Sequence, residues 1–403
     1  MKKVCMVIAD HPFMDARIFK KEAKSLQKKG YSVTMIVPRR NGRLFDIDGT
    51  PFRHNFRSKI FTYEGIKIIT YNSESSTSLN KVLSDVSVWE SQGFNHPLVQ
   101  LAMKEDADIY HTHEYLSLFA GIGIKRLMKK QKGKDVKLIY DSHELTPDPL
   151  SPRYPKEIKD NLEQKLFIML DEVDYVITVS ESIKSWYKSH KPNLPVEVIY
   201  NSPPLAKNYL SKDPKPQKMI VGFEGNIDNK QRMKEKIIEI TDICSKMIDF
   251  QFKVIGGSRY NDVLIVPDSL KSKIIMTGWV DYRTIPSHMK EIDVGWVDLE
   301  DVEQSLSHDY AMPNKFFSYL NNGIPVVVNK CHDMEQFIRR HQCGVVIDKT
   351  KATAKDYANV LLSLHQDRKK LRLLGDNGRK AMENLYSWER MEQRLFEVYQ
   401  QLI

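Results

Sequence analysis

Short apolar segments alternate with longer amphipathic segments along nearly the whole chain, and this alternation constrains the fold more than any other feature of the sequence. Short runs rich in Val, Ile and Tyr indicate strands that are buried on both faces, as in parallel sheets covered by helices. We therefore predict an α/β fold with doubly wound, Rossmann-like sheets. The expected strands cover residues 4–9, 32–37, 60–63, 66–71, 108–111, 137–140, 175–179 and 196–200, followed by 219–224, 250–256, 274–277, 294–297, 324–328 and 344–347.

The alternation occurs twice, and a segment of different composition separates the two occurrences. Residues 201–217 are rich in proline and lysine and poor in apolar residues, which is typical of a linker. We expect an N-terminal domain over residues 1–200 and a C-terminal domain over residues 218–385. The chain has 403 residues, of which 41% are apolar, and this is enough for two cores. Two such domains facing each other would hold a ligand in the cleft between them.

The sequence argues against several classes of protein. No GxGxxG motif follows the first expected strand, which argues against an oxidoreductase that binds a dinucleotide. The four cysteines lack metal-like spacing, so we expect reduced thiols in a cytoplasmic protein. No run of 18 apolar residues occurs, so we expect no membrane-spanning helix.

One basic cluster stands out against a net charge of only +9. A basic helix end could attract anionic lipid by about 1 kcal/mol per cation, which would place the protein at the inner face of the cell membrane. It could equally be a solvated helix end whose cations suit the helix dipole. No aromatic residues are interleaved with the cations, so we expect no nucleic-acid partner. The cluster consists of Lys125, Arg126, Lys129, Lys130, Lys132 and Lys134.

Residues 308–328 read as a loop, a short helix, a turn and a buried strand. Pro313 suits the first turn of a helix, and Gly323 is placed to end it. The free N–H groups at such a helix start attract anions. Lys315 lies in the first turn, where the helix dipole does not stabilise a cation. A phosphate near Lys315 is one explanation of this charge, and an ordinary solvated lysine is the other.

Polar residues after other expected strands are further candidates, because ligands in such sheets bind beyond the carboxyl ends of the strands. Asp15 and Arg17 follow the first strand, where Asp15 could instead cap a helix. Lys230 and Arg232 follow the first strand of the C-terminal domain. They could pair with a diphosphate or remain solvated.

Two histidine motifs also follow strands. His111 and His113 lie beside a glutamate and could suggest a metal site, but a third ligand at useful spacing is not apparent. We therefore expect these residues to line a binding cleft without a metal. His143 lies next to Glu144 and could act as an acid, a base or a hydrogen-bond donor to a substrate hydroxyl. The alternative is a histidine that bonds to a neighbouring carbonyl.

Nine short segments occur in an order and spacing that are found together in a known family: residues 15–20, 108–113, 140–145, 176–181, 198–201, 278–280, 313–317, 323–327 and 387–389. Taken together, they resemble the retaining, nucleotide-sugar-using glycosyltransferases of family 4, and the resemblance covers nearly the whole chain. It implies a GT-B fold in which residues 386–403 form a helix that crosses back to the N-terminal domain.

The resemblance also implies a function. A sugar would pass from a nucleoside diphosphate sugar to a glycan, lipid-linked or polymeric acceptor, with retention, in bacterial cell-surface polysaccharide synthesis. No cofactor or metal is implied, since cationic side chains would neutralise the leaving diphosphate. The implied catalytic residues are His143 and Lys315; the donor-binding residues are Gly225, Asn226, Lys230, Arg232, Pro313, Asn314, Lys315, Phe316 and Ser318; and the acceptor-binding residues are Asp15, Arg17, His113 and Glu144.

The chain departs from the family at some of these positions. Members usually carry two glutamates where this chain has Tyr310 and Ser318, and the second normally holds the donor ribose. A serine can still bond a hydroxyl, but it lacks the charge and the reach of a glutamate. The family also tends to place an arginine at the position of Asn226. A non-catalytic relative that binds a glycan or a partner glycosyltransferase is therefore the alternative. A sugar-nucleotide epimerase on the same fold fits residues 313–315 less well.

Overall fold

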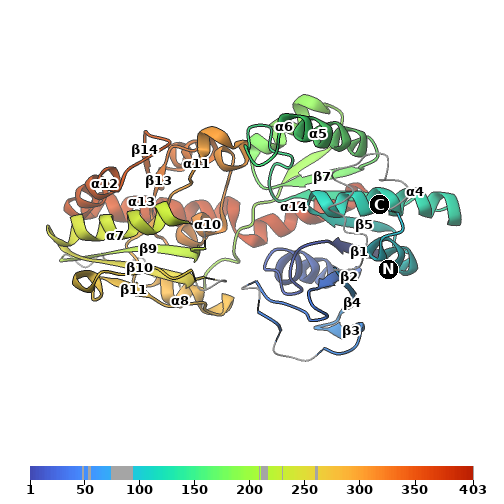
Figure 1. Cartoon of the computed structure of the whole chain (residues 1–403), viewed down its shortest axis with the longest axis horizontal. Coiled ribbons are helices and arrows are strands. Elements are labelled where there is room, and N and C mark those ends of the chain that lie inside the picture. Colours follow the sequence, from blue (N-terminus) through green and yellow to red (C-terminus); the bar gives the residue numbers. More distant parts are fainter. Residues whose placement is uncertain are drawn as a thin grey trace. The chain divides into compact units, whose positions relative to one another are not determined.

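The structure is a computed structural model that describes residues 1–47, 50–52, 56–73, 94–207, 209, 217–228, 230–258 and 262–402. The chain divides into two compact units, which consist of residues 1–199 with 392–403 and of residues 200–391. Each unit contains one sheet with helices packed against it (Figure 1). Residues 208 and 210–216 of the expected linker lie outside the described residues.

The first unit is built on an eight-stranded sheet with the order β3-β4-β2-β1-β5-β6-β7-β8. All neighbouring pairs are parallel except β3 and β4, which form an antiparallel pair at the edge. The expected strands of this half are all present, and each differs from its expected bounds by two residues or fewer. The strands are β1 (Lys3–Ile8), β2 (Ser32–Arg39), β3 (Ile60–Tyr63), β4 (Ile66–Asn72), β5 (Ile109–His113), β6 (Lys137–Ser142), β7 (Tyr175–Thr178) and β8 (Val196–Val198).

The helix after β1 begins later than its apolar pattern predicts. Residues 14–29 show helical spacing, but the regular helix starts with a π-helical turn, η1 (Ile18–Ala23), and continues as α1 (Lys24–Lys28). Asp15 explains the delay, because its Oδ1 accepts hydrogen bonds from the backbone N–H groups of Arg17 (2.8 Å) and Ile18 (3.0 Å). A side chain that caps the first turn in this way marks the start of a helix. The other helices of this unit are α3 (Pro97–Glu105), α4 (Glu114–Lys132), α5 (Lys156–Leu170) and α6 (Glu181–His190).

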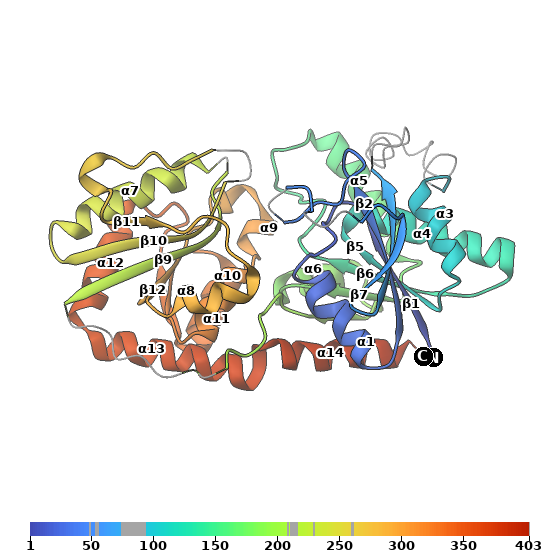
Figure 2. The ribbon, with the colours of Figure 1, turned by 90° about the horizontal axis from the view of Figure 1, so that it is seen from below.

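The second unit is built on a six-stranded parallel sheet with the order β11-β10-β9-β12-β13-β14. Figure 2 shows β11, β10, β9 and β12 in this order across the sheet. All six expected strands of this half are present. They are β9 (Lys218–Asn226), β10 (Asp249–Gly257), β11 (Ile274–Met276), β12 (Val294–Val297), β13 (Val326–Asn329) and β14 (Gly344–Ile347).

Helices cover both faces of the second sheet. The apolar side chains of α7 (Gln231–Ser245) and α12 (Ala354–Gln366) pack with those of β9, β10 and β12 into one core. On the other face α10 (Asn314–Asn321) contacts β9, β12 and β13. The remaining helices are α8 (Ile285–Met289), α9 (Leu306–Asp309), α11 (His332–His341), α13 (Arg368–Ala381) and a π-helical turn, η7 (Met382–Tyr386).

The C-terminal helix α14 (Trp388–Gln401) belongs to both units, since the boundary falls within it. Its last turns pack on the first unit, where the hydroxyl of the fully buried Tyr399 lies 2.9 Å from His111 Nδ1. Arg394 Nη1 donates to the carbonyl of Val198 at 3.1 Å.

Both sheets are doubly wound, and each has one point at which the strand order reverses. In the first sheet this point lies between β1 and β5, and in the second it lies between β9 and β12. Ligands in open α/β sheets bind beyond the carboxyl ends of the strands at such a point. We therefore expect the loops after β1, β5 and β9 to carry ligand-binding residues.

Tyr319 fixes helix α10 against the second sheet. Its ring lies against Gly295 of β12, where an added Cβ atom would be 2.3 Å from the ring carbons. Its hydroxyl donates to the carbonyl of Gly222 (2.9 Å) and accepts from the N–H of Glu224 (2.8 Å). One side chain thus joins α10 to two backbone groups of β9.

We predict that Gly295→Ala destabilises the second unit by about 1–3 kcal/mol, because the ring of Tyr319 has to move aside in a packed core. Urea denaturation of the wild type and of Gly295→Ala measures the change in the free energy of unfolding. Gly257→Ala is the matched control, since its Cβ would meet Trp279 at an ordinary 3.6 Å. An equal free energy of unfolding for the two variants would contradict the role given to Tyr319.

Candidate functional site

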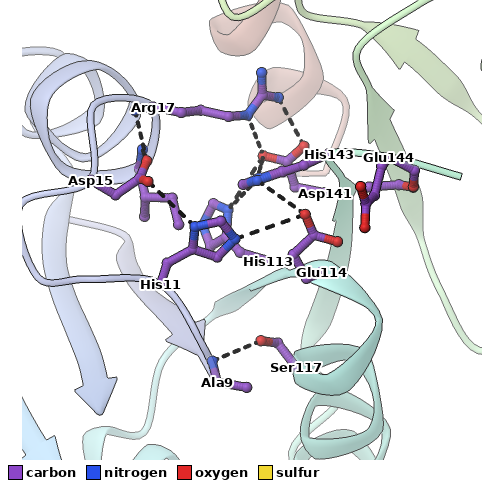
Figure 3. Close-up of polar contacts among 12 residues, drawn as sticks. Ala9, His11, Asp15, Arg17, His113, Glu114, Ser117, Asp141, His143 and Glu144 are labelled. Carbon is purple, nitrogen blue, oxygen red and sulfur yellow. Dashed lines mark hydrogen bonds and ion pairs between the residues drawn. The ribbon is translucent and has the colours of Figure 1, made fainter. Parts of the chain in front are cut away.

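Charged and polar side chains gather beyond the carboxyl ends of β1, β5 and β6 in the first unit (Figure 3). They come from the loop after β1, from η1, from the last residues of β5, from the end of β6 and the residue after it, and from the first turn of α4. The members are His11, Asp15, Arg17, Glu22, His111, His113, Glu114, Asp141 and His143. We call this set the strand-end cluster.

Arg17 and Asp141 form the buried centre of the strand-end cluster. Arg17 Nε and Nη2 donate to the two carboxylate oxygens of Asp141 at 3.0 and 2.8 Å, and Nη1 donates to the carbonyl of Ile199 at 2.8 Å. Burial by itself would raise the pKa of Asp141, but the Arg17 guanidinium and the neighbouring His143 hold it well below its usual range. This bidentate pair therefore stays ionised in the interior.

Glu22 lies beside the same guanidinium nitrogen that contacts Asp141, with Oε1 2.9 Å from Arg17 Nε. Burial and the charge of Asp141 raise the pKa of Glu22 well above its usual value. Two carboxylates that share one guanidinium cannot both ionise easily, so one of them keeps a proton. Asp141 is the anion of the pair, because it makes the bidentate contact.

His11 binds two carboxylates at the outer side of the cluster. Its Nδ1 lies 3.3 Å from Asp15 Oδ2, and its Nε2 lies 3.8 Å from Glu114 Oε1. Burial opposes its charge, but these two carboxylates raise the pKa of His11 to about 10. The ring is therefore an imidazolium at neutral pH and joins β1 to α4.

His143 is the most accessible of the sequence-predicted residues in the strand-end cluster. Its Nε2 lies 3.2 Å from Asp141 Oδ2, and its Nδ1 lies 3.4 Å from Glu114 Oε1. Its side chain is 13% exposed. Carboxylates at both ring nitrogens fix the orientation of the ring. Glu144 is exposed and, in Figure 3, lies to one side of the cluster.

The structure places Arg17 and His113 in the interior of the first unit, which does not suit the acceptor-binding roles expected of them. The side chain of Arg17 is 2% exposed, and its donors contact Asp141 and a backbone carbonyl. His113 is fully buried, with Nδ1 3.3 Å from Asp141 Oδ2, and burial lowers its pKa to about 4. Asp15 is also buried and caps the turn before η1. These residues hold the first unit together and do not line a surface.

Four fully buried groups have the chemistry of metal ligands: Glu22, His111, His113 and Asp141, whose ligand atoms lie within 4.8 Å of one another. Neither Glu22 oxygen accepts a hydrogen bond, and His111 Nε2 has no hydrogen-bond partner, although it lies 3.8 Å from Asp141 Oδ2. Arg17 Nε, however, already lies 2.9 Å from Glu22 and 3.0 Å from Asp141. A divalent cation between these carboxylates would face a fixed positive charge, so the donor set does not fit a metal well.

The second unit brings several sequence-predicted donor residues together at the end of β9. Gly225 has a φ of +133°, and an added Cβ atom would be 3.3 Å from Lys315 Nζ. Lys315 also lies over the ring of Phe223, with Nζ 3.9 Å from the ring centroid. The glycine therefore leaves the space that the ammonium group occupies. The side-chain oxygen of Asn226 accepts a hydrogen bond from the N–H of Asp228 at 2.9 Å.

The charges around Lys315 show which cations lie near it. Burial and the charge of Lys230 lower the pKa of Lys315, the charge of Glu224 raises it, and the resulting pKa is about 7. Lys230 therefore lies close enough for its charge to act on Lys315. Arg232 is different, because its side chain is 67% exposed and its Nη1 lies 3.3 Å from Asp301 Oδ1. The expectation that Arg232 helps to bind a diphosphate is not supported by this position.

Helix α10 begins at Asn314, and Pro313 is its N-cap residue instead of its first helical residue. No side chain caps this end. Asn314 is exposed, and Phe316 is buried in the core beneath. The N–H of Phe316 donates to the carbonyl of Pro313 at 2.9 Å, and those of Asn314 and Lys315 remain available beside the positive charge of Lys315, which is the arrangement that attracts an anion.

Ser318, one turn further along α10, lines a cavity of about 810 Å³ within the second unit. Asn321 and Asn322 line it from the end of the same helix, while residues 203–207 and the segment 282–290 form its other walls. A volume of this size is typical of a site for a small organic ligand.

The sequence analysis missed Glu224. The residue lies near the end of β9, and its Oε2 is buried without a hydrogen-bond partner. Burial raises the pKa of Glu224, whereas a hydrogen bond from Ser318 and the charge of Lys315 lower it. A carboxylate directly before the glycine of an otherwise apolar strand was the available signal.

The basic cluster on and after α4 is largely neutralised. Five of its six cations have acidic partners within 4.0 Å: Lys125 with Asp174, Arg126 with Glu172, Lys129 with Asp135, Lys132 with Asp106, and Lys134 with Asp106 and Asp108. Within the described residues, no helix is long and apolar enough to cross a membrane.

We predict that Arg17→Met destabilises the first unit by about 3–5 kcal/mol, because it leaves Asp141 and Glu22 buried without their cation. Methionine keeps most of the side-chain volume of arginine, so the loss of stability reports the loss of the charge. The measurement is the free energy of unfolding in urea. Arg126→Met is the control, since it breaks a partly exposed pair with Glu172 and should change stability by about 1 kcal/mol or less. Similar values for both variants would refute the central position of Arg17.

Comparison with family models gives two matches. Residues 16–205 match the model described as Glycosyltransferase Family 4, and residues 247–371 match the model described as Glucosyltransferase 3-like, C-terminal domain. A search of curated proteins finds no match. Part of the second unit therefore matches a different model from the first unit, and it is in the second unit that Ser318 and Asn226 depart from the family 4 pattern.

Solved structures share the fold along the whole chain. Sucrose-phosphate synthase from Thermosynechococcus elongatus aligns over 100% of this chain and 99% of its own, with a TM-score of 0.69 and 16% identity. Alr3699/HepE from Anabaena, in complex with UDP and glucose, aligns over 99% of both chains, with a TM-score of 0.68 and 14% identity. A glycosyltransferase from Rickettsia africae aligns over 100% of this chain and 98% of its own, with a TM-score of 0.66 and 16% identity.

These matches confirm the predicted α/β fold with two domains and its GT-B type. The chain therefore has the GT-B fold of the glycosyltransferases to which it is similar, and its residues 16–205 match glycosyltransferase family 4.

Proposed function

We propose that this protein transfers a sugar from a nucleoside diphosphate sugar to a glycan or lipid-linked acceptor, with retention of the anomeric configuration. The observation that carries the proposal is the position of Lys315. Its ammonium group lies beside Gly225 at the end of β9, in the first turn of an uncapped helix whose next turn lines a large cavity. A diphosphate at the helix start and a nucleoside in the cavity would use all of these features.

The electrostatics of the second unit support this use. When the bond between sugar and diphosphate breaks, negative charge grows on the leaving diphosphate. Lys315, Lys230 and the free N–H groups of α10 would stabilise that charge where it develops. The proposal requires no metal or cofactor, because these groups supply the positive charge.

His143 would be the group of the first unit that contacts the donor sugar. It is partly exposed, and carboxylates at both nitrogens orient its ring. The proposal no longer includes Arg17 and His113 in acceptor binding, because both are buried. Retention rests on the resemblance to family 4, and proton NMR of the product anomer tests it.

The choice of first substrates follows from the similar structures. Alr3699/HepE was solved with UDP, with UDP and glucose, and with UDP-glucose. UDP-sugars are therefore the first donors to test, with cell-surface glycan extracts as acceptors, since synthesis of bacterial surface polysaccharide is part of the proposal. Attachment to anionic lipid is not part of it, because the basic cluster is largely neutralised.

We predict that Lys315→Ala lowers kcat at least about 100-fold, as expected when a donor to a developing oxyanion is removed. Release of UDP from UDP-sugars measures turnover. Lys246→Ala, an exposed lysine of the same unit that pairs with Asp242, should keep the wild-type rate. Wild-type turnover in Lys315→Ala would refute the proposed site. Nucleotide binding without turnover in the wild type would favour a non-catalytic glycan-binding relative.

We also predict that the affinity for UDP-glucose falls as the pH rises above about 7. The pKa of Lys315 is lowered to about 7, and a bound diphosphate favours the protonated form. Below this pH the cation is already present, and above it binding must also take up a proton, which weakens affinity by up to about tenfold per pH unit. Calorimetry at pH 6 to 9 measures this. Lys315→Arg should remove the dependence, because its guanidinium stays charged, and a flat wild-type profile would contradict the assignment.

A further inference from the structure

Glu224 is a partly buried acid of the second unit whose carboxylate group is incompletely satisfied. Its Oε2 is shielded from solvent and has no hydrogen-bond partner. Burying a carboxylate oxygen without a donor is unfavourable, so such an atom in a native protein calls for an explanation.

The surroundings of Glu224 are fixed by backbone contacts. Glu224 pairs with Ile255 in the β9–β10 register, and its N–H donates to the Tyr319 hydroxyl at 2.8 Å. Tyr319 follows Ser318 directly in α10, so the same contact holds Ser318 beside Glu224. The carboxylate is thus positioned between a rigid strand and a helix that lines the cavity.

Lys315 does not fully satisfy this carboxylate. It lies near enough for its charge to act on Glu224. Among the ion pairs within 4.0 Å that join described residues, however, none links the two, and the ammonium group lies over the ring of Phe223 instead. Glu224 therefore retains one oxygen for another hydrogen-bond donor.

We propose that Glu224 is a donor-binding residue, whose Oε2 accepts a hydrogen bond from a hydroxyl group of the nucleoside diphosphate sugar bound in the cavity beside Ser318. This inference rests on the proposed function. Glu224 supplies a carboxylate from strand β9, at a place where helix α10 offers only the hydroxyl of Ser318. The hydroxyl belongs either to the ribose or to the transferred sugar, and these two sources are distinguished by the choice of ligand.

The test compares wild type with Glu224→Gln, which keeps the shape and removes the charge. Calorimetry first identifies the tightest of UDP, GDP, ADP and CDP, and then measures its 2′-deoxy counterpart and its glucose conjugate. If the partner is the ribose 2′-hydroxyl, wild type binds the ribonucleotide about tenfold more tightly than the deoxynucleotide, and Glu224→Gln abolishes this preference. If the partner is on the sugar, only the glucose conjugate binds about tenfold more weakly to Glu224→Gln. Both results support the proposal.

A second variant separates a binding role from a structural one. Glu224→Gln combined with Ser318→Glu returns a carboxylate to the cavity from α10, and this pair should regain at least half of the lost affinity on a logarithmic scale. Glu239→Gln, an exposed residue of α7, is the control and should bind as wild type does. Thermal melting of each variant checks that it is folded.

Two outcomes overturn the inference, and they differ in what else they overturn. If Glu224→Gln binds all ligands as tightly as wild type, Glu224 has no binding role, while the proposed function stands. If wild type binds none of the four nucleotides and none of their glucose conjugates, the proposed function fails and the inference fails with it.

Discussion

The hydroxyl of Tyr319 ties helix α10 to strand β9, and the arrangement of the candidate donor site depends on this tie. One oxygen atom bonds Gly222 and Glu224, two residues apart on the strand. The ring can lie close to the sheet only because Gly295 has no side chain. Lys315, Ser318 and the free N–H groups of α10 are positioned by this contact, and so is their distance from the end of β9. The packing of a helix against a sheet therefore sets the arrangement of the site, and few groups of the site are flexible.

The first unit uses its charged residues differently. Arg17 and Asp141 form a bidentate, fully buried pair, and the histidines and carboxylates around it connect β1, β5, β6 and α4. Buried charges persist only when they are paired and hydrogen-bonded, and here the central pair joins residues 124 positions apart in the sequence. Motifs that look catalytic in the sequence thus serve mainly to hold the sheet ends together. His143 and the exposed Glu144 are the sequence-predicted residues of this end that remain accessible.

The donor side also shows how a site can be built from residues at unexpected positions. In family 4 the carboxylate that holds the ribose normally comes from the helix position that Ser318 occupies here. In this chain Glu224 brings a carboxylate to the same neighbourhood from the adjacent strand. The end of a strand and the end of a helix converge at the point where the strand order reverses. A carboxylate can therefore be supplied by either element and still occupy nearly the same place in the site. The match of residues 247–371 to a Glucosyltransferase 3-like model agrees with a second unit that departs from family 4.

The sequence alone determined the class of fold, the strands of both sheets and the segment that carries Lys315, because apolar periodicity and the Pro and Gly signals at 313 and 323 are local properties. It also identified the strand ends as the places where polar residues gather. Only the tertiary structure decided which of these residues are accessible. Arg17 and His113 became buried partners of Asp141, and Arg232 turned out to pair with Asp301 at the surface. The role proposed for Glu224 depends on Ser318 and Lys315, which lie some 90 residues away along the chain. Burial and the pairing of charges depend on residues far apart in sequence, and no local pattern encodes them.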